Sequence, residues 1–91
     1  MTDKVAVVTG AWRGIGLEVC RQLAERGMTV VLTARDPEKA KVAAEQFIGE
    51  GLDVISKALD VSNEESVRGV AAELEQQFGT VDVLVNNAAG V

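Results

Sequence analysis

The stretch Thr9-Gly10-Ala11-Trp12-Arg13-Gly14-Ile15-Gly16 decides how this chain folds. It follows an apolar run at residues 4–9, which is typical of a strand buried on both faces. Apolar residues then recur at helical spacing as far as Leu23, and Gly27 is placed to end that helix. The stretch is therefore predicted to be a glycine-rich turn that joins a buried strand to a helix.

Such a turn has a specific use, because the amino end of a helix offers unpaired N–H groups and a partial positive charge that suit a pyrophosphate. Gly10 permits the tight turn, Gly14 lets the backbone approach the phosphates, and Gly16 has no side chain to hold the helix away from the sheet. The alternative is that the three glycines only make a sharp loop. Their place between a strand and a helix favours phosphate binding.

Strands and helices are expected to alternate along the rest of the chain. Further strands are predicted at residues 29–34, 53–59 and 81–85, separated by two helical segments that Gly49 or Gly51 and then Gly79 would end. This order predicts an α/β fold, the Rossmann-type half, with a parallel four-stranded sheet in the order 3-2-1-4 and helices on both faces. Residues 1–91 would form one domain part that stops after the fourth strand, whose outer edge is then open to self-association.

The two later helices carry recognisable starts. Asp36 before Pro37 predicts an N-cap with proline at the first helical position, and Ser62 with Glu65 predicts a capping box. The residues expected on their inner faces are Ala40, Ala44, Phe47 and Ile48 in one helix, and Val67, Val70, Ala71, Leu74 and Phe78 in the other.

Composition excludes several classes of function. A net charge of −5 argues against a general nucleic-acid or membrane-surface binder, and no apolar run approaches the length of a membrane span. No stretch resembles a signal peptide, and the single cysteine, Cys20, fits core packing in a reducing cytoplasm. The chain has neither histidine nor tyrosine, so no metal site and no catalytic residue are predicted in it.

Four motifs together resemble the classical short-chain dehydrogenase/reductase family. The glycine turn has that family's spacing, Thr-Gly-x-x-x-Gly-Ile-Gly, rather than the G-x-G-x-x-G of ordinary dinucleotide dehydrogenases. The other three follow in the family's order: Thr33-Ala34-Arg35-Asp36, Asp60-Val61 and Leu84-Val85-Asn86-Asn87-Ala88. The resemblance covers the whole chain and is greatest to the NADPH-dependent carbonyl reductase group. It implies the NADP(H)-binding portion of a carbonyl or alcohol oxidoreductase.

The resemblance also assigns roles to single residues. It implies that Asp60 accepts a hydrogen bond from the adenine amino group, and that Asn87 braces the sheet. Asp60 has the alternative role of capping the turn into the next helix, and the asparagines that of ordinary strand-end residues. The remaining implied contacts are Gly10, Gly14, Ile15 and Gly16 to the pyrophosphate, the Val61 backbone to adenine, and Asn86 and Ala88 to the ribose.

The preferred cofactor follows from the end of the second strand. An NAD-selective enzyme of this fold places a carboxylate there, whereas this chain has Ala34 followed by Arg35. In the family's geometry Arg13 lies on the same side, so two guanidinium groups would clamp the 2′-phosphate of NADP. NAD is then the less favoured cofactor. The alternative is two solvated surface arginines.

Two departures from the family pattern stand out. Ala89 replaces the family's glycine, with Gly90 one position late. Trp12 is a bulky residue for the turn, facing either the adenosine or solvent.

The family's catalytic tyrosine, lysine and serine lie beyond the fourth strand, so the chain alone is expected to be inactive. A small-molecule carbonyl or alcohol would be the substrate of the complete protein. The alternative readings are a self-standing nucleotide-binding module and an interaction module that completes its sheet with another chain.

Overall fold

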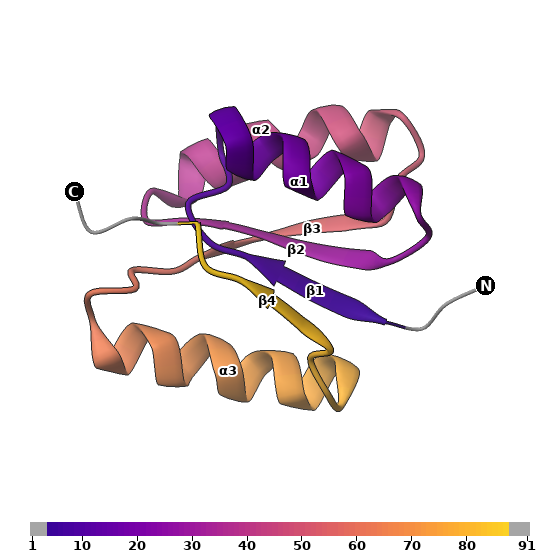
Figure 1. Cartoon of the computed structure of the whole chain (residues 1–91). Coiled ribbons are helices and arrows are strands. Elements are labelled where there is room, and N and C mark those ends of the chain that lie inside the picture. Colours follow the sequence, from indigo (N-terminus) through magenta and orange to yellow (C-terminus); the bar gives the residue numbers. More distant parts are fainter. Residues whose placement is uncertain (1–3, 88–91) are drawn as a thin grey trace.

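The computed structural model describes residues 4–87 and contains a four-stranded parallel sheet in the order β3-β2-β1-β4. Helices α1 and α2 cover one face of the sheet and α3 covers the other (Figure 1). The predicted fold class, strand order and two-sided helix arrangement are confirmed. The elements are β1 (Val5–Val8), α1 (Gly14–Glu25), β2 (Thr29–Ala34), α2 (Pro37–Gly49), β3 (Val54–Ala58), α3 (Glu64–Phe78) and β4 (Val83–Val85).

Side chains on the two central strands point alternately to the two faces of the sheet, and both faces are buried. Val8 and Leu32 point toward α1 and α2, where they pack with Phe47 in the larger core cluster. Val7 and Val31 belong to the second cluster, on the α3 side. Because side chains on a strand alternate between faces, a strand with helices on both sides is apolar throughout, as β1 is.

The outer strand β4 is shorter than predicted. Its approach to β1 is fixed by Asp82, whose backbone N–H donates to the Val5 carbonyl at 2.9 Å. The Asp82 carboxylate in turn accepts from the Val5 N–H at 2.9 Å. A side chain therefore takes the place of a backbone acceptor, and regular pairing begins only at Val83.

The helix starts were predicted correctly for α2 and incorrectly for α3. Asp36 caps α2 by accepting from the Glu38 N–H at 2.9 Å, with Pro37 at the first helical position. At α3 the cap is Asn63, whose side chain accepts from two backbone N–H groups of the first turn. The predicted Ser62–Glu65 capping box is wrong, because the Ser62 hydroxyl donates instead to Asp60 at 2.6 Å.

The inner face of α2 differs from the prediction by one residue, and the inner face of α3 is narrower than predicted. Ile48 is 53% exposed, and Ala43 occupies the buried position instead. On α3, Val67 and Ala71 are exposed, while Val70 and Leu74 alone are fully buried. A helix that contacts only the sheet buries residues four apart along a single stripe, so the flanking apolar positions remain in solvent.

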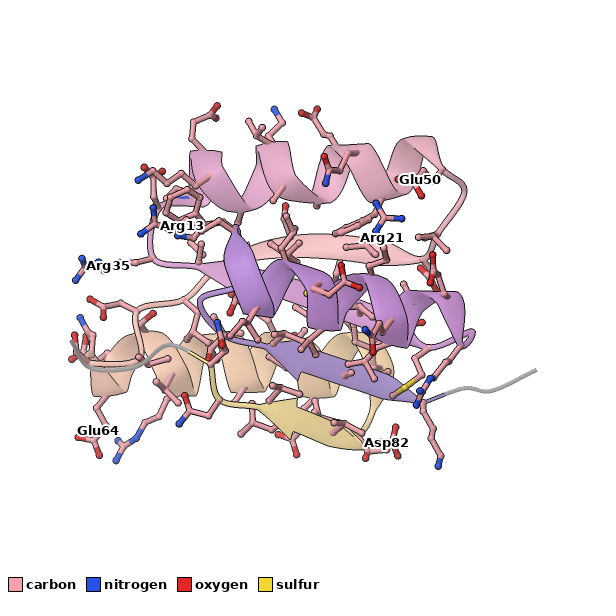
Figure 2. All side chains as sticks on the ribbon, turned by 45° about the horizontal axis from the view of Figure 1, so that its top comes forward. Arg13, Arg21, Arg35, Glu50, Glu64 and Asp82 are labelled. Carbon is pink, nitrogen blue, oxygen red and sulfur yellow. The ribbon has the colours of Figure 1, made fainter. Side chains whose placement is uncertain are left out.

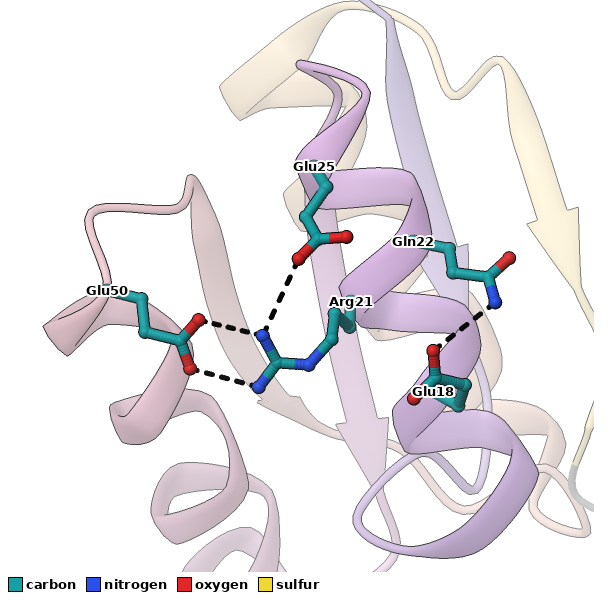
Figure 3. Close-up of polar contacts among 5 residues, drawn as sticks. All are labelled: Glu18, Arg21, Gln22, Glu25 and Glu50. Carbon is teal, nitrogen blue, oxygen red and sulfur yellow. Dashed lines mark hydrogen bonds and ion pairs between the residues drawn. The ribbon is translucent and has the colours of Figure 1, made fainter.

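An ion-pair cluster joins α1 to the end of α2. The Arg21 guanidinium makes two parallel hydrogen bonds to the Glu50 carboxylate, at 2.7 and 2.9 Å (Figure 3). The same guanidinium lies over the Phe47 ring at 4.9 Å and within 3.7 Å of Glu25. These bonds hold the pKa of Glu50 below its ordinary value and raise that of Arg21. This cluster of charged side chains thus links α1 to the carboxyl end of α2.

Candidate nucleotide-binding site

The glycine turn uses backbone conformations that favour glycine. Gly10 has φ +57° and Gly14 has φ +63°, both in the left-handed region. The turn is held to β2 by the Ala11 N–H, which donates to the Thr33 carbonyl at 2.9 Å. It is held to the residues after β4 by the Asn87 amide, which donates to the Gly10 carbonyl at 3.0 Å. The turn is therefore anchored on both sides before any ligand binds.

Gly16 lies where α1 passes closest to the turn. An added Cβ would be 2.6 Å from the Asn87 side-chain nitrogen and 2.9 Å from both the Ala11 Cα and the Gly10 carbonyl oxygen. Two of these three neighbours are backbone atoms, which cannot rotate away. The close approach of helix and turn thus depends on the missing side chain, as the glycine spacing predicts.

The end of β4 reaches the turn through Thr9. The buried Thr9 hydroxyl accepts from the Asn87 N–H at 2.9 Å and lies within 3.2 Å of the Asn86 side-chain oxygen. Asn87 braces the sheet against the turn, the role the family resemblance implied. Ala88, expected beside Asn86 at the ribose, lies outside the described residues, as do Ala89 and Gly90.

The amino end of α1 differs from those of the other two helices. Within residues 4–87, α1 has no capping side chain and no acidic residue in its first turn. By contrast, α2 and α3 are each capped by a side chain, and each has glutamate in the first turn. Because helix N–H groups and the helix dipole favour a negative charge at this end, α1 is the helix left for an external anion. Ile15, in that first turn, is 77% exposed.

Three basic side chains gather beside the turn. Arg35 and Lys39 line a pocket of about 390 Å³ together with Trp12 and Asp36. Arg13 lies at the same end of the molecule as Arg35, with its guanidinium 4.5 Å from the centre of the Trp12 ring (Figure 2). The structure therefore brings the two predicted arginines to one corner, at the carboxyl end of the sheet.

Sequence reasoning missed Lys39. This residue is in the first turn of α2, three positions after the Asp36 cap, and therefore lies at the same end as Arg35. Its ammonium group is 4.3 Å from the centre of the Trp12 ring. A lysine in the first turn of a helix that follows the second strand is the feature that would have identified it.

Asp60 performs the capping role offered as its alternative. Its carboxylate accepts from the Ser62 hydroxyl at 2.6 Å and from the Ser62 N–H at 3.0 Å. These two bonds, and further the charge of Arg35, lower the pKa of Asp60 despite partial desolvation. The neighbouring Val61 is 43% exposed. The adenine contact predicted for these two residues stays a prediction.

Comparison with known proteins identifies the family. Residues 4–91 match the short chain dehydrogenase family. The chain belongs to that family. It is 46% identical, over 96% of its length, to (+)-neomenthol dehydrogenase of Arabidopsis thaliana. It is 44% identical, over 92% of its length, to "Carbonyl reductase [NADPH] 1" of Bos taurus. The matched part is 31% of each of these two relatives. A metagenomic short-chain oxidoreductase in complex with NADP superposes with a TM-score of 0.90 at 42% identity, over all of this chain and 41% of that one. The chain spans about a third of the length of the curated relatives it matches.

Residues 4–87 of this short-chain dehydrogenase chain offer neither a metal site nor a membrane-spanning helix. Residues 4–87 contain no group of three acidic, cysteine or histidine residues that could hold a metal ion. No helix in the same range is long and apolar enough to cross a membrane. Cys20 is buried on α1, where desolvation raises the pKa of its thiol to about 12, and it packs as a small apolar residue.

Proposed function

We propose that this chain is the NADP(H)-binding part of a short-chain dehydrogenase/reductase that interconverts carbonyls and alcohols. The basic pocket at the end of β2, beside the glycine turn, carries the proposal. A pocket lined by Arg35 and Lys39 offers charge-assisted hydrogen bonds to a phosphate on the adenosine ribose. Two relatives support it: one is named for NADPH, and the other was solved with NADP.

The carboxylate expected of an NAD-binding site is missing from the described end of β2. Ala34 occupies the position and is 1% exposed. The next carboxylate, Asp36, is engaged as the cap of α2, where it accepts from the Glu38 N–H at 2.9 Å. Arg35 is exposed and lies close enough to influence Asp60. The site thus has positive charge where a ribose hydroxyl would need an acceptor.

We propose the pyrophosphate contacts on the geometry of the turn, and the adenine and ribose contacts on the family resemblance. Gly14 lies at the amino end of α1, and a Cβ added there would meet no described atom within 4 Å. That open space and the uncapped helix end suit the pyrophosphate. We assign Gly10, Gly14, Ile15 and Gly16 to the pyrophosphate, Arg13, Arg35 and Lys39 to the 2′-phosphate, Asp60 and Val61 to adenine, and Asn86 and Ala88 to the ribose.

The bound cofactor would supply the hydride, and this chain would hold and orient it. The chain contains no tyrosine or histidine to protonate a carbonyl oxygen. We therefore propose that the 91-residue chain binds NADPH without oxidising it when aldehydes and ketones are added. Steady NADPH consumption proportional to the amount of pure chain would contradict this. A cytoplasmic location, a small-molecule substrate and no nucleic-acid partner complete the proposal.

Titration calorimetry with NADP and NAD tests the cofactor assignment. We expect NADP to bind about 30- to 1,000-fold more tightly, the range for partly exposed charge-assisted bonds. Arg35→Ala should remove much of the preference, and Ala34→Asp should turn it toward NAD. Arg68→Ala is the matched control, since this arginine lies on α3 and its side chain is 78% exposed. Equal dissociation constants for the two cofactors in the unmutated chain would refute the proposal.

A further inference from the structure

The only tryptophan of the chain lies among the basic residues of the site. The Trp12 ring has the Lys39 ammonium 4.3 Å from its centre and the Arg13 guanidinium 4.5 Å from it. One of these cations comes from α2 and the other from the glycine turn. A single aromatic ring therefore brings together positive charges that belong to two separate segments.

Trp12 is also a wall shared by two adjacent hollows. One is the 390 Å³ pocket that Arg35 and Lys39 line. The other, of about 420 Å³, lies between α1 and α2. Its apolar lining is Trp12, Leu17, Val42 and Ala43, and its polar lining is Glu38, Lys39 and Gln46. Trp12 is half-buried and packs against the core cluster beneath these helices. The ring is thus held by apolar packing, while the cations on it belong to exposed side chains.

We propose that Trp12 is a positioning and specificity residue for the 2′-phosphate of the cofactor. The inference rests on the proposed function and deepens it. Free lysine and arginine side chains lose conformational entropy when they converge on a phosphate. Attraction to the face of a fixed indole ring confines Lys39 and Arg13 before the ligand arrives. Trp12 itself contributes no hydrogen bond to the phosphate and acts through the two cations.

The arrangement predicts an effect that depends on the phosphate. A residue that only shapes the pocket would change the affinity for every adenosine ligand alike. A residue that positions cations changes the affinity for ligands with a 2′-phosphate and spares those without it. The two probes that separate these cases are 2′,5′-ADP, which carries one phosphate on each of the 2′ and 5′ oxygens of adenosine, and 5′-AMP, which lacks only the 2′-phosphate.

The experiment measures the affinity of the 91-residue chain for both probes by titration calorimetry. Trp12→Leu keeps apolar bulk without a π face, and Trp12→Phe keeps a π face. We expect Trp12→Leu to weaken 2′,5′-ADP binding about 5- to 10-fold, the size expected when two exposed cation–π contacts are lost. Binding of 5′-AMP should change by less than about twofold, and Trp12→Phe should retain most of the affinity for 2′,5′-ADP.

A second measurement leaves Trp12 in place and does not depend on the folding of its variants. Saturating 2′,5′-ADP should shift the Trp12 emission, because the 2′-phosphate neutralises the cations next to the ring, and saturating 5′-AMP should shift it much less. In Lys39→Met the shift should be reduced. A third measurement uses the variants again: in a double-mutant cycle of 2′,5′-ADP affinity, the effects of Trp12→Leu and Lys39→Met should not be additive, and additive effects would overturn the role of Trp12.

The possible failures are distinguishable. If the unmutated chain binds both probes equally, the proposed function and the role of Trp12 fall together. The other case is that the unmutated chain prefers 2′,5′-ADP. If Trp12→Leu then lowers the affinity for both probes by the same factor, or lowers neither affinity, only the role of Trp12 is overturned. An emission spectrum that 2′,5′-ADP leaves unchanged would overturn it as well.

Discussion

Gly16→Ala is the substitution for which the structure predicts the sharpest loss of stability. The added methyl group would lie 2.9 Å from the Ala11 Cα and from the Gly10 carbonyl oxygen, closer than side-chain carbons approach such atoms. It would also lie 2.6 Å from the Asn87 nitrogen, which donates to that same carbonyl. Relief therefore requires α1 to move away from the turn, or Asn87 to give up its bond.

The magnitude follows from opposing effects. Overpacking against backbone costs about 1–3 kcal/mol. Loss of the Asn87 hydrogen bond costs about 1 kcal/mol more. The better helix propensity of alanine returns about 0.5–1 kcal/mol, because Gly16 lies within α1. We expect the free energy of unfolding to fall by about 1–3.5 kcal/mol.

Urea denaturation followed by circular dichroism measures this loss, with Gly69→Ala as the matched control. Gly69 is also a helical glycine, on α3, but a Cβ there would meet no described atom within 4 Å. The control should therefore gain about 0.5–1 kcal/mol from propensity alone. If Gly16→Ala proved as stable as the control, the close packing of α1 on the turn would be refuted.

Three further predictions each concern a single side chain. Cys20 should react with Ellman's reagent only after denaturant is added, because burial raises its thiol pKa to about 12; fast labelling of the native chain would contradict this. Glu50→Gln should lower the melting temperature at about pH 7 and lower it less at about pH 3. Arg21 lowers the pKa of Glu50 in the folded chain. The ion pair therefore stabilises the fold above the ordinary pKa of 4.5, and this stabilisation is lost as the pH falls through the lowered pKa of the folded chain. An equal difference at both pH values would count against the pair. Asn63→Ala should cost about 1 kcal/mol in denaturant titrations and Ser62→Ala less, because Asn63 caps α3; the reverse order would restore the predicted capping box.

The central part of the fold was predictable because its local and long-range requirements agree. β2 begins and ends at the predicted residues, since Thr29–Ala34 is β-branched and apolar and is followed by the Asp36 cap with proline. β4 was predicted two residues too long, because its first pairing with β1 uses the Asp82 side chain. A contact between residues 77 positions apart leaves no trace in the local pattern.

The error at α3 has a different physical origin. Ser62 and Asn63 are both good N-cap residues, so helix propensity alone does not choose between them. The choice is made by Asp60, which holds the Ser62 hydroxyl and backbone N–H and leaves Asn63 to cap the helix. The first turn of α3 is thus set by a residue in the connection that follows β3.

The candidate site was predictable where it depends on backbone, and only in part where it depends on long side chains: Arg13 and Arg35 were predicted, and Lys39 was missed. Gly10 and Gly14 adopt the left-handed conformation that their spacing indicated. The positions of Lys39 and of the Trp12 ring depend on how α2 packs beside the turn, a tertiary arrangement that periodicity does not encode. The contacts that would set cofactor preference therefore lie partly outside the family motifs.

The charge distribution limits what the basic corner can bind. The chain has 14 acidic and 9 basic residues, and three of the nine, Arg13, Arg35 and Lys39, gather around one aromatic ring and one pocket. A nucleic acid requires positive charge spread along a face, since its phosphates repeat every few ångströms. Here the acidic remainder of the chain would repel such a polyanion, while the local cluster matches a single dianion. We therefore infer that one phosphate group, presented next to a pyrophosphate on the uncapped end of α1, is the ligand pattern this surface fits.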